Sequence, residues 1–170
     1  VAGAGSTAAV GATSVPRRYL DRTMVLETTF HTPTGTLVVV DALAAGLGNR
    51  HHELGMDAPH VILRQATCTG GTVEVEFEWA PRPEYGLIHP IVSPREGGAM
   101  AVGGADILVL SSPAALASAD NTAPARFGLG GGGTTDFSND PYTRSPRTAA
   151  RVRDAPERGA GTGAKPETGW

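Results

Sequence analysis

The feature that most restricts the fold is a period of two, because apolar and polar residues alternate through most of residues 1–129. In TVEVEFEWA (72–80), valine, phenylalanine and tryptophan take every second position and glutamate takes positions between them. Such alternation indicates a β-strand with one buried face, whereas a helix would repeat every 3.6 residues. No stretch of about ten residues combines that helical period with capping residues, so we expect strands without helices.

Residues that favour turns separate the alternating stretches and predict β-hairpins. The predicted pairs are 24–31 with 36–43, 60–68 with 72–80, and 99–102 with 105–112, followed by an edge strand at 125–129. Their turns are Pro33–Gly35, Thr69–Gly71 and Gly103–Gly104, and the last is short enough for a primed turn with positive φ. Successive hairpins without helices predict an all-β fold, an antiparallel β-sandwich.

The last part of the chain, residues 130–170, is rich in glycine, proline and arginine and poor in large apolar side chains. Such a segment cannot bury enough apolar surface to offset the entropy that it would lose on ordering. We therefore expect two regions, a partial β-sandwich at 1–129 and a disordered tail at 130–170. The change at Leu129 is also what out-of-frame reading of a GC-rich gene would produce.

Charge and composition argue against several classes of function. A formal net charge of -3 with a pI near 5.9 gives no field that attracts nucleic acid. No apolar run reaches the roughly 18 residues that span a bilayer, and the start lacks a signal-peptide pattern. Cys68 is the only cysteine, which excludes an internal disulfide. We therefore expect a cytoplasmic protein that binds neither nucleic acid nor membrane.

The opening VAGAGSTAAVGA places Gly3, Gly5 and Ala8 at the G-x-G-x-x-A spacing of a dinucleotide-binding loop. That loop needs a buried strand before it and a helix after it. Only two residues precede Gly3, and Gly11 and Pro16 would break a helix that began near Ala8. The spacing therefore does not indicate a nucleotide site, and we expect no cofactor.

Glu74, Glu76 and Glu78 are the carboxylates most suited to acid–base catalysis. On a strand, residues i and i+2 are about 6.5–7 Å apart, which reaches the lower end of the carboxyl separation in inverting glycosidases. A catalytic pair, however, needs unlike surroundings that separate its two pKa values. The apolar residues between the three glutamates place all of them on one solvated face, so we predict no catalytic residue there.

The segment NRHHELGMDAPH brings His51, His52, Glu53 and His60 close together in the sequence. Their spacing is not the H-E-x-x-H of a zinc-binding helix, and the glycine and proline indicate a loop. Cys68 ends an apolar strand, where a thiol is inert. We therefore predict neither a metal site nor a cysteine nucleophile.

A stiff surface loop is predicted at APRPEYG (80–86), where two prolines fix the backbone and a glycine permits a turn. It would present Arg82, Glu84 and Tyr85 together, and an aromatic ring beside ion-pairing groups suits a sugar face or a protein interface. The simpler interpretation, which we favour, is a rigid connector whose Tyr85 covers the edge of the core.

Four stretches, in this order, resemble the N-terminal domain of bacterial glycoside hydrolase family 15 proteins, the trehalase-like and glucoamylase-like enzymes. They are STAAVG (6–11), RRYLDRTMVLETTFHTPTGTLVVVDAL (17–43), EVEFEWAPRPEYG (74–86) and GGADILVLSS (103–112). The resemblance covers residues 6–129 and implies a supersandwich-like domain that precedes an (α/α)6 barrel. In the family two glutamates of that barrel hydrolyse α-glucosidic bonds with inversion, and neither has a counterpart in this chain.

The chain departs from the family pattern at two places. After Gly11 the family continues with D-G-S-x-D-W-x-C-x-P-R-x-D-S and a further strand, whereas here ATSV leads directly to PRRYL. Loss of a paired strand would leave an exposed edge and a smaller core, so we expect an incomplete sandwich. After Leu129 the family continues with strands and a helical linker, for which this sequence has no match.

The resemblance implies a non-catalytic domain that supports the barrel of a parent enzyme, with trehalose or an α-glucan as that enzyme's substrate. Its partner would be the barrel, and the chain alone would have no glycosidase activity. Two alternatives remain open. One is a stand-alone carbohydrate-binding module that uses the Arg82–Tyr85 loop, and the other is a truncated or frameshifted product without a function.

Overall fold

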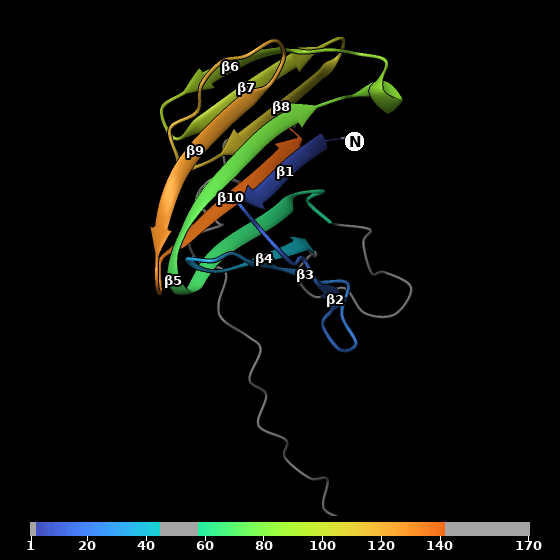
Figure 1. Cartoon of the computed structure of the whole chain (residues 1–170). Helices are drawn as coiled ribbons and strands as arrows, with labels where there is room; N and C mark the ends of the chain where they lie inside the picture. The colour runs from blue at the N-terminus through green and yellow to red at the C-terminus, as the bar shows by residue number, and fades with distance from the viewer. Residues whose placement is uncertain (1–2, 45–57, 142–170) are drawn as a thin grey trace, which may run out of the picture.

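The computed structural model describes residues 3–44 and 58–141, where the fold is antiparallel β-structure with one short 3₁₀ turn, η2 (Glu84–Gly86). Ten strands follow one another along the chain (Figure 1). They are β1 (Gly3–Ala9), β2 (Arg17–Tyr19), β3 (Leu26–His31), β4 (Gly35–Leu43), β5 (Ile62–Pro81), β6 (Ile91–Arg95), β7 (Gly98–Gly103), β8 (Asp106–Ser111), β9 (Ala123–Gly130) and β10 (Thr134–Pro141). The predicted all-β class is confirmed. Over the same residues, no helix has the length and apolar character needed to cross a membrane.

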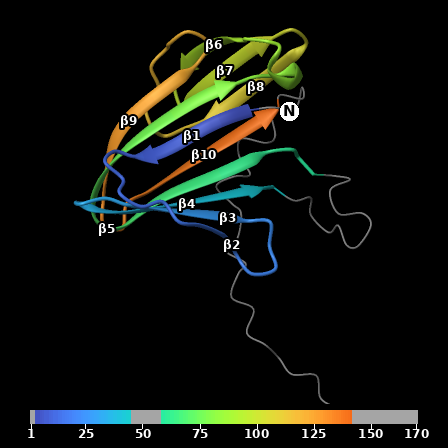
Figure 2. The same ribbon diagram turned by 45° about the vertical axis from the view of Figure 1, so that its right-hand side comes forward.

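The strands form two layers that share β5. Residues 72–81 of β5 pair with β1 on one side and with β9 on the other, and we call these three strands the short layer. Residues 62–71 of β5 pair with β4 and β10 in the long layer, whose order is β2-β3-β4-β5-β10-β8-β7-β6. Figures 1 and 2 show β2, β3 and β4 extending beyond β1. The predicted antiparallel sandwich is therefore confirmed, with layers of unequal width.

A single strand, β5, stands where the sequence predicted a hairpin at 60–80. It runs for 20 residues, and its register against β4 shifts between Thr36 and Leu37, which leaves Thr69 without a partner in β4. Thr69–Gly71 therefore belong to a bulged strand and not to a turn. Gly71 has a φ of 69°, and a Cβ there would lie 2.0 Å from the Thr34 carbonyl oxygen. The predicted hairpin is wrong because glycines that permit a turn also permit the bend by which β5 passes between layers.

Two other predicted hairpins are confirmed, β3 with β4 and β7 with β8. In the second, Gly103 pairs with Asp106, so the loop is Gly104–Ala105, one residue later than predicted. Gly104 has the expected positive φ, 62°. The strand predicted at 125–129 is also confirmed as part of β9, which is an edge strand of the short layer.

The predicted boundary at residue 129 is wrong, because β10 lies beyond it. This strand pairs with both β5 and β8, and its Phe137 is 4% exposed. The glycine-rich composition predicts disorder here, although the buried ring of Phe137 anchors the strand in the core. The sandwich therefore continues to Pro141, and a change of reading frame at Leu129 is not needed to explain residues 130–141. The rest of the predicted tail, 142–170, lies outside the described residues.

Two clusters of buried apolar side chains fill the space between the layers. The larger includes Phe77, Trp79, Leu108, Leu110 and Phe137, and the other includes Phe30, Leu37, Val39, Cys68 and Val75. Neither reaches β2, all three of whose residues are exposed. The core thus lies under the short layer and ends where that layer ends.

Candidate functional site

The predicted surface loop is present and rigidly held. Pro81 and Pro83 are buried on either side of Arg82, which donates from Nη1 to the carbonyl oxygens of Pro81 (2.8 Å) and Asn121 (3.2 Å). Asn121 in turn donates from Nδ2 to the Pro90 carbonyl oxygen at 2.7 Å, so both ends of the loop are fastened to one residue. The loop projects from one end of the sandwich as η2 (Figure 1).

The three predicted site residues do not converge. Arg82 is half-buried and turned toward backbone carbonyls, whereas Glu84 and Tyr85 are exposed. Both exposed residues have a left-handed backbone conformation, with φ of 53° and 56°. This conformation costs free energy in any residue that carries a side chain. Tyr85 is 99% exposed, so it does not cover the edge of the core as the simpler interpretation required.

Three large apolar side chains that follow Tyr85 in the chain are exposed as well. We call the four side chains the η2 patch: Tyr85, Leu87, Ile91 and Val102 are 99%, 83%, 73% and 40% exposed. Ile91 and Val102 lie opposite each other on β6 and β7. The signal in the sequence is GLIHPI, where the apolar residues beside Pro90 follow no strand-like alternation. Ile91 and Val102 thus form an exposed apolar pair, and adjoining exposed apolar side chains are typical of a surface that contacts a partner.

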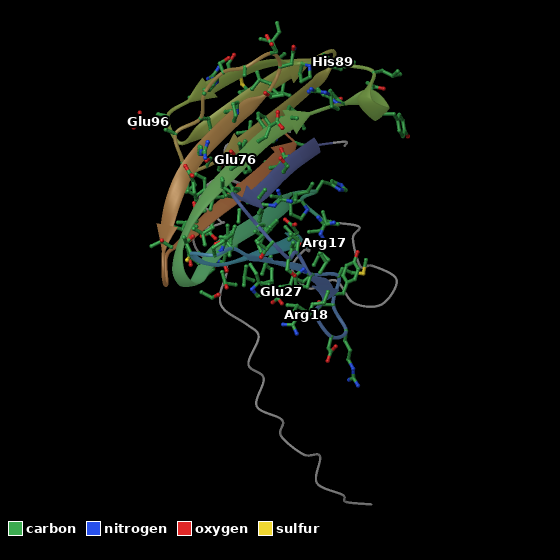
Figure 3. The ribbon with its side chains drawn as sticks, in the orientation of Figure 1. Arg17, Arg18, Glu27, Glu76, His89 and Glu96 are labelled. Atoms are coloured by element: carbon green, nitrogen blue, oxygen red, sulfur yellow. The ribbon has the colours of Figure 1, made fainter. Side chains whose placement is uncertain are left out.

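The glutamate row on β5 faces solvent, as predicted. Val75, Phe77 and Trp79, which alternate with the glutamates, are 0%, 3% and 1% exposed. Figure 3 shows Glu76 on the outer surface of the short layer. An open depression of about 490 Å³ lies here, and small side chains such as Ala8 form part of its lining.

Arg126 of β9 neutralises part of this row. Its Nε lies 2.6 Å from Glu74 Oε1 and its Nη2 lies 2.9 Å from Oε2, while Nη1 is 3.6 Å from Glu76 Oε1. The hydrogen bond from Arg126 lowers the pKa of Glu74 below its ordinary value of 4.5. A carboxyl group held ionised in this way cannot serve as a general acid near neutral pH. The row therefore has the chemistry of a solvated ion-pair surface.

The opening glycines are part of a strand. Gly3 and Gly5 lie in β1, opposite Pro81 and Trp79 of β5, so their spacing reflects a sheet edge and not a phosphate-binding loop. Among the residues that were weighed as metal ligands and not predicted to be such, His51, His52 and Glu53 lie outside the described residues. In the part of the chain that the structure describes, no three His, Cys, Asp or Glu side chains gather as metal ligands would. Cys68 is completely buried.

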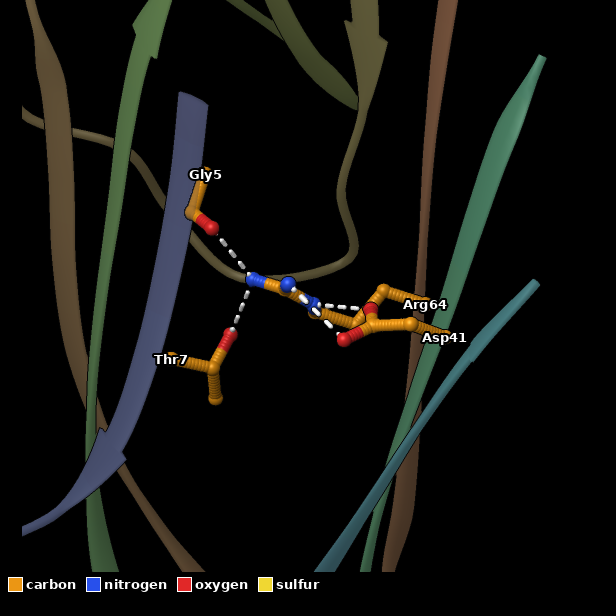
Figure 4. Close-up of polar contacts among 4 residues, drawn as sticks. All are labelled: Gly5, Thr7, Asp41 and Arg64. Atoms are coloured by element: carbon orange, nitrogen blue, oxygen red, sulfur yellow. Dashed lines mark hydrogen bonds and ion pairs between the residues drawn. The ribbon is translucent and has the colours of Figure 1, made fainter. Parts of the chain in front are cut away.

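A polar cluster between the layers joins Arg64 of β5 to Asp41 of β4. Two hydrogen bonds link them, Nε to Oδ1 at 2.6 Å and Nη2 to Oδ2 at 3.1 Å. Arg64 Nη1 also donates to the Gly5 carbonyl oxygen (2.7 Å) and the Thr7 hydroxyl (3.1 Å) of β1 (Figure 4). No local pattern in the sequence indicates this cluster, because its four residues come from three separate strands.

A family model described as "Trehalase-like, N-terminal" matches residues 2–123 of the chain. A trehalase of Mycobacterium tuberculosis (strain ATCC 25618 / H37Rv) is 35% identical over 129 residues, which cover 69% of this chain and 18% of that protein. A trehalase of Mycolicibacterium smegmatis (strain ATCC 700084 / mc(2)155) is 40% identical over 83 residues, 42% of this chain and 12% of that protein. The chain thus spans less than a fifth of the length of these two relatives.

Proposed function

The chain belongs to the trehalase-like N-terminal family, and from that premise we propose that it serves as a non-catalytic β-sandwich domain of a longer trehalase-like enzyme. In the glycoside hydrolase family 15 interpretation, its role is to support an (α/α)6 barrel that hydrolyses α-glucosidic bonds. The observation that carries this proposal is a difference in coverage. The family model matches residues 2–123 of the chain, whereas the matched stretches make up only 18% and 12% of the two trehalases.

The charge arrangement on the short layer supports a non-catalytic role. The glutamates of β5 stand on an open surface, and Arg126 holds Glu74 ionised by two hydrogen bonds. Glycoside hydrolysis needs one carboxylic acid and one carboxylate in enclosed, unlike surroundings. In this proposal catalysis belongs to the barrel, and the single cysteine suits a cytoplasmic enzyme.

In this proposal the Arg82–Tyr85 loop and the η2 patch form the surface that contacts the barrel. The loop is stiff, because Arg82 is bound to two carbonyl oxygens, so little backbone entropy is lost when Tyr85 is covered. Leu87 and Ile91 add apolar surface that contact with a second domain would remove from water.

A second candidate function is carbohydrate binding by the same loop, and the exposure of Tyr85 favours it. A 99% exposed tyrosine ring is able to stack on the apolar face of a sugar. Titration of the isolated chain with trehalose and maltose would then shift the Tyr85 amide resonance, and Tyr85→Ala would abolish the shift. No shift at saturating sugar removes this candidate.

A chimaera tests the main proposal. The stretch of the Mycobacterium tuberculosis trehalase that matches this chain is replaced by the corresponding residues of this chain, and trehalose hydrolysis and thermal unfolding are measured. We expect an active chimaera. The changes Tyr85→Ser and Leu87→Ser together should lower its unfolding temperature and its activity, because they weaken the contact between domains.

The matched control is a chimaera with Glu74→Gln and Glu76→Gln, which alters the outer surface of the short layer and should keep full activity. Release of glucose from trehalose by the isolated chain, lost on Glu74→Gln or Glu76→Gln, would overturn the proposal. Poorly dispersed amide resonances from the isolated chain would instead favour a fragment that does not fold.

A further inference from the structure

Within residues 3–44 and 58–141, the strand β1 has one edge without a partner strand. In the described residues it pairs with β5 only, and the hydrogen bond from the Val10 amide to the Glu74 carbonyl fixes its orientation. Backbone groups of successive residues point to opposite sides of a strand. Gly5 and Thr7 therefore direct their N–H and C=O groups away from β5, toward the free edge.

Arg64 occupies this free edge from the other layer. It bonds the Gly5 carbonyl oxygen at 2.7 Å, which is the acceptor that an additional strand would use. Neighbouring strands lie about 4.7–4.9 Å apart, so the guanidinium stands where that strand would run. Asp41 holds the other side of the guanidinium with two hydrogen bonds (Figure 4), so the arginine cannot swing aside without leaving a carboxylate unpaired.

An uncovered apolar surface lies next to the same edge. On the face of β4 that points to the core, Leu37 and Val39 are 0% and 2% exposed, but Leu43 on the same face is 69% exposed. Tyr19, which lies opposite Leu26 on the neighbouring strand, is 65% exposed. Figure 2 shows β2, β3 and β4 extending past β1, and Leu43 and Tyr19 are exposed on this part of the long layer. A strand added to β1 would cover it.

We propose that the free edge of β1 is a strand-pairing surface for a second copy of this chain, and that the Arg64–Asp41 pair keeps this surface closed. The proposal concerns self-association and does not depend on the proposed function. A folded protein with an open, flat edge strand pairs readily with other copies, and inward-pointing charges are one way to prevent it.

The four edge strands of the described structure differ in how well their own residues prevent pairing with another chain. β6 carries Pro94 and Arg95, β9 carries Arg126, and β2 is three residues long with two arginines. In contrast, β1 has the sequence GAGSTAA, with no charge, no proline and only small side chains. Its free edge is instead blocked by Arg64, which belongs to β5. Because every copy has the same edge, two β1 strands can pair in antiparallel fashion about a two-fold axis.

The test opens the edge and measures the mass of the full chain in solution. In Asp41→Asn/Arg64→Met both charges are removed together, so no unpaired carboxylate remains. We expect the wild type to be a monomer by light scattering and the double variant to double its mass. Hydrogen exchange at the Thr7 amide, which faces the free edge, should slow in the double variant as protein concentration rises.

Two further variants identify the surface. Adding Thr7→Pro to the double variant removes an edge-facing N–H without breaking a hydrogen bond to β5, and it should restore the monomer. The matched control, Glu74→Gln/Arg126→Met, removes an arginine–carboxylate pair from the exposed face of β5 and β9. It should remain a monomer, because that pair bonds no edge carbonyl.

A double variant that is folded by amide dispersion but stays a monomer at every concentration at which the wild type is soluble overturns the proposal. So does a dimer that Thr7→Pro leaves intact. If the double variant does not fold, the variant Arg64→Lys tests the proposal instead. One ammonium group cannot bond both Asp41 oxygens and the Gly5 carbonyl oxygen at once, as the guanidinium does. Concentration-dependent slowing of Thr7 exchange in Arg64→Lys supports the proposal, and unchanged exchange overturns it.

Discussion

The ring of Phe137 stacks on the ring of Phe77 between the two layers, with centroids 4.1 Å apart and planes inclined by 6°. Phe77 comes from the part of β5 that belongs to the short layer, and Phe137 comes from β10 of the long layer. This contact makes β10 part of the core. The glycine-rich connection before β10 therefore joins two elements of one domain.

Shortening the side chain at this contact should destabilise the fold strongly. Phe137→Ala removes a buried ring and leaves a cavity, so we expect the free energy of unfolding to fall by about 3–5 kcal/mol. Urea unfolding followed by circular dichroism measures it. The control Leu87→Ala, at a side chain that is 83% exposed, should stay within about 0.5 kcal/mol of the wild type. A loss below about 1 kcal/mol for Phe137→Ala would show that β10 is not needed for the core.

The sequence predicted those parts of the fold that depend on local patterns. The alternation around Phe77 and the glycine at position 104 indicated the right strands and a turn with positive φ. The bulge at Gly71 was misread because its glycines look the same in a turn and in a bent strand. β10 was missed because it is stabilised by contacts with β5 and β8, which are far away in the sequence.

In the candidate sites, too, local patterns were predicted from the sequence and contacts between distant residues were not. Alternation alone was enough to place Glu76 on a solvated face. In contrast, the orientation of Arg82 toward the Asn121 carbonyl depends on a contact across 39 residues. The pairing of Arg64 with Asp41 follows from the register of β4 against β5, which places the two residues opposite each other. The overhang of β2 beyond β1 follows from the unequal widths of the two layers. No local pattern in the sequence records those widths.

The bulge in β5 predicts unequal effects of two neighbouring substitutions. Gly71→Ala would place a Cβ 2.0 Å from the Thr34 carbonyl oxygen at a φ of 69°, whereas a Cβ at Gly70 meets nothing within 4 Å. We expect Gly71→Ala to lower the free energy of unfolding by about 1–3 kcal/mol and Gly70→Ala to have a much smaller effect. Parallel urea titrations compare them. Equal losses would mean that the crossing does not depend on the conformation of Gly71.

The left-handed backbone of η2 predicts that glycine is tolerated better than other residues there. Glu84 has a φ of 53°, so Glu84→Gly relieves strain and should raise the free energy of unfolding by about 0.5–1 kcal/mol, after the entropy that glycine gains in the unfolded chain. The reverse change, Gly86→Ala at a φ of 90°, should cost about 1 kcal/mol, since its Cβ meets no atom within 4 Å. Thermal unfolding of both variants measures the effect. A loss of stability in Glu84→Gly would contradict the assignment of strain.

The ion pair between Arg126 and Glu74 predicts a dependence on acid pH. Arg126 lowers the pKa of Glu74 below 4.5, so the folded chain holds the ionised form more tightly than the unfolded chain does. This contribution is present in full above pH 4.5 and is lost as the pH falls through the lower pKa of the folded state. Arg126→Gln should therefore be less stable than the wild type at pH 7, and the difference should close in acid. A difference that persists below the pKa of the folded state would point to packing instead.

Asp140 predicts a dependence of stability on pH with the opposite sign to that of Glu74. Burial raises the pKa of its carboxyl group above the ordinary 3.8, because the charged form loses solvation in β10. At neutral pH the group is ionised in both states and the folded state carries the cost of desolvation. As the pH falls through the raised pKa, the folded chain takes up the proton first, and the cost disappears by the time the pH reaches about 3.8.

Asp140→Asn removes this charge and should therefore increase the free energy of unfolding at pH 7, with the gain shrinking as the pH is lowered. Urea midpoints of the wild type and the variant, measured in steps from pH 7 to pH 3, follow the difference. Asp136→Asn is the control, because Asp136 is exposed on the same strand and its Oδ1 accepts a hydrogen bond from Gln65 at 2.9 Å. If Asp140→Asn is less stable than the wild type at pH 7, the carboxylate is stabilised by its surroundings and the desolvation argument is wrong.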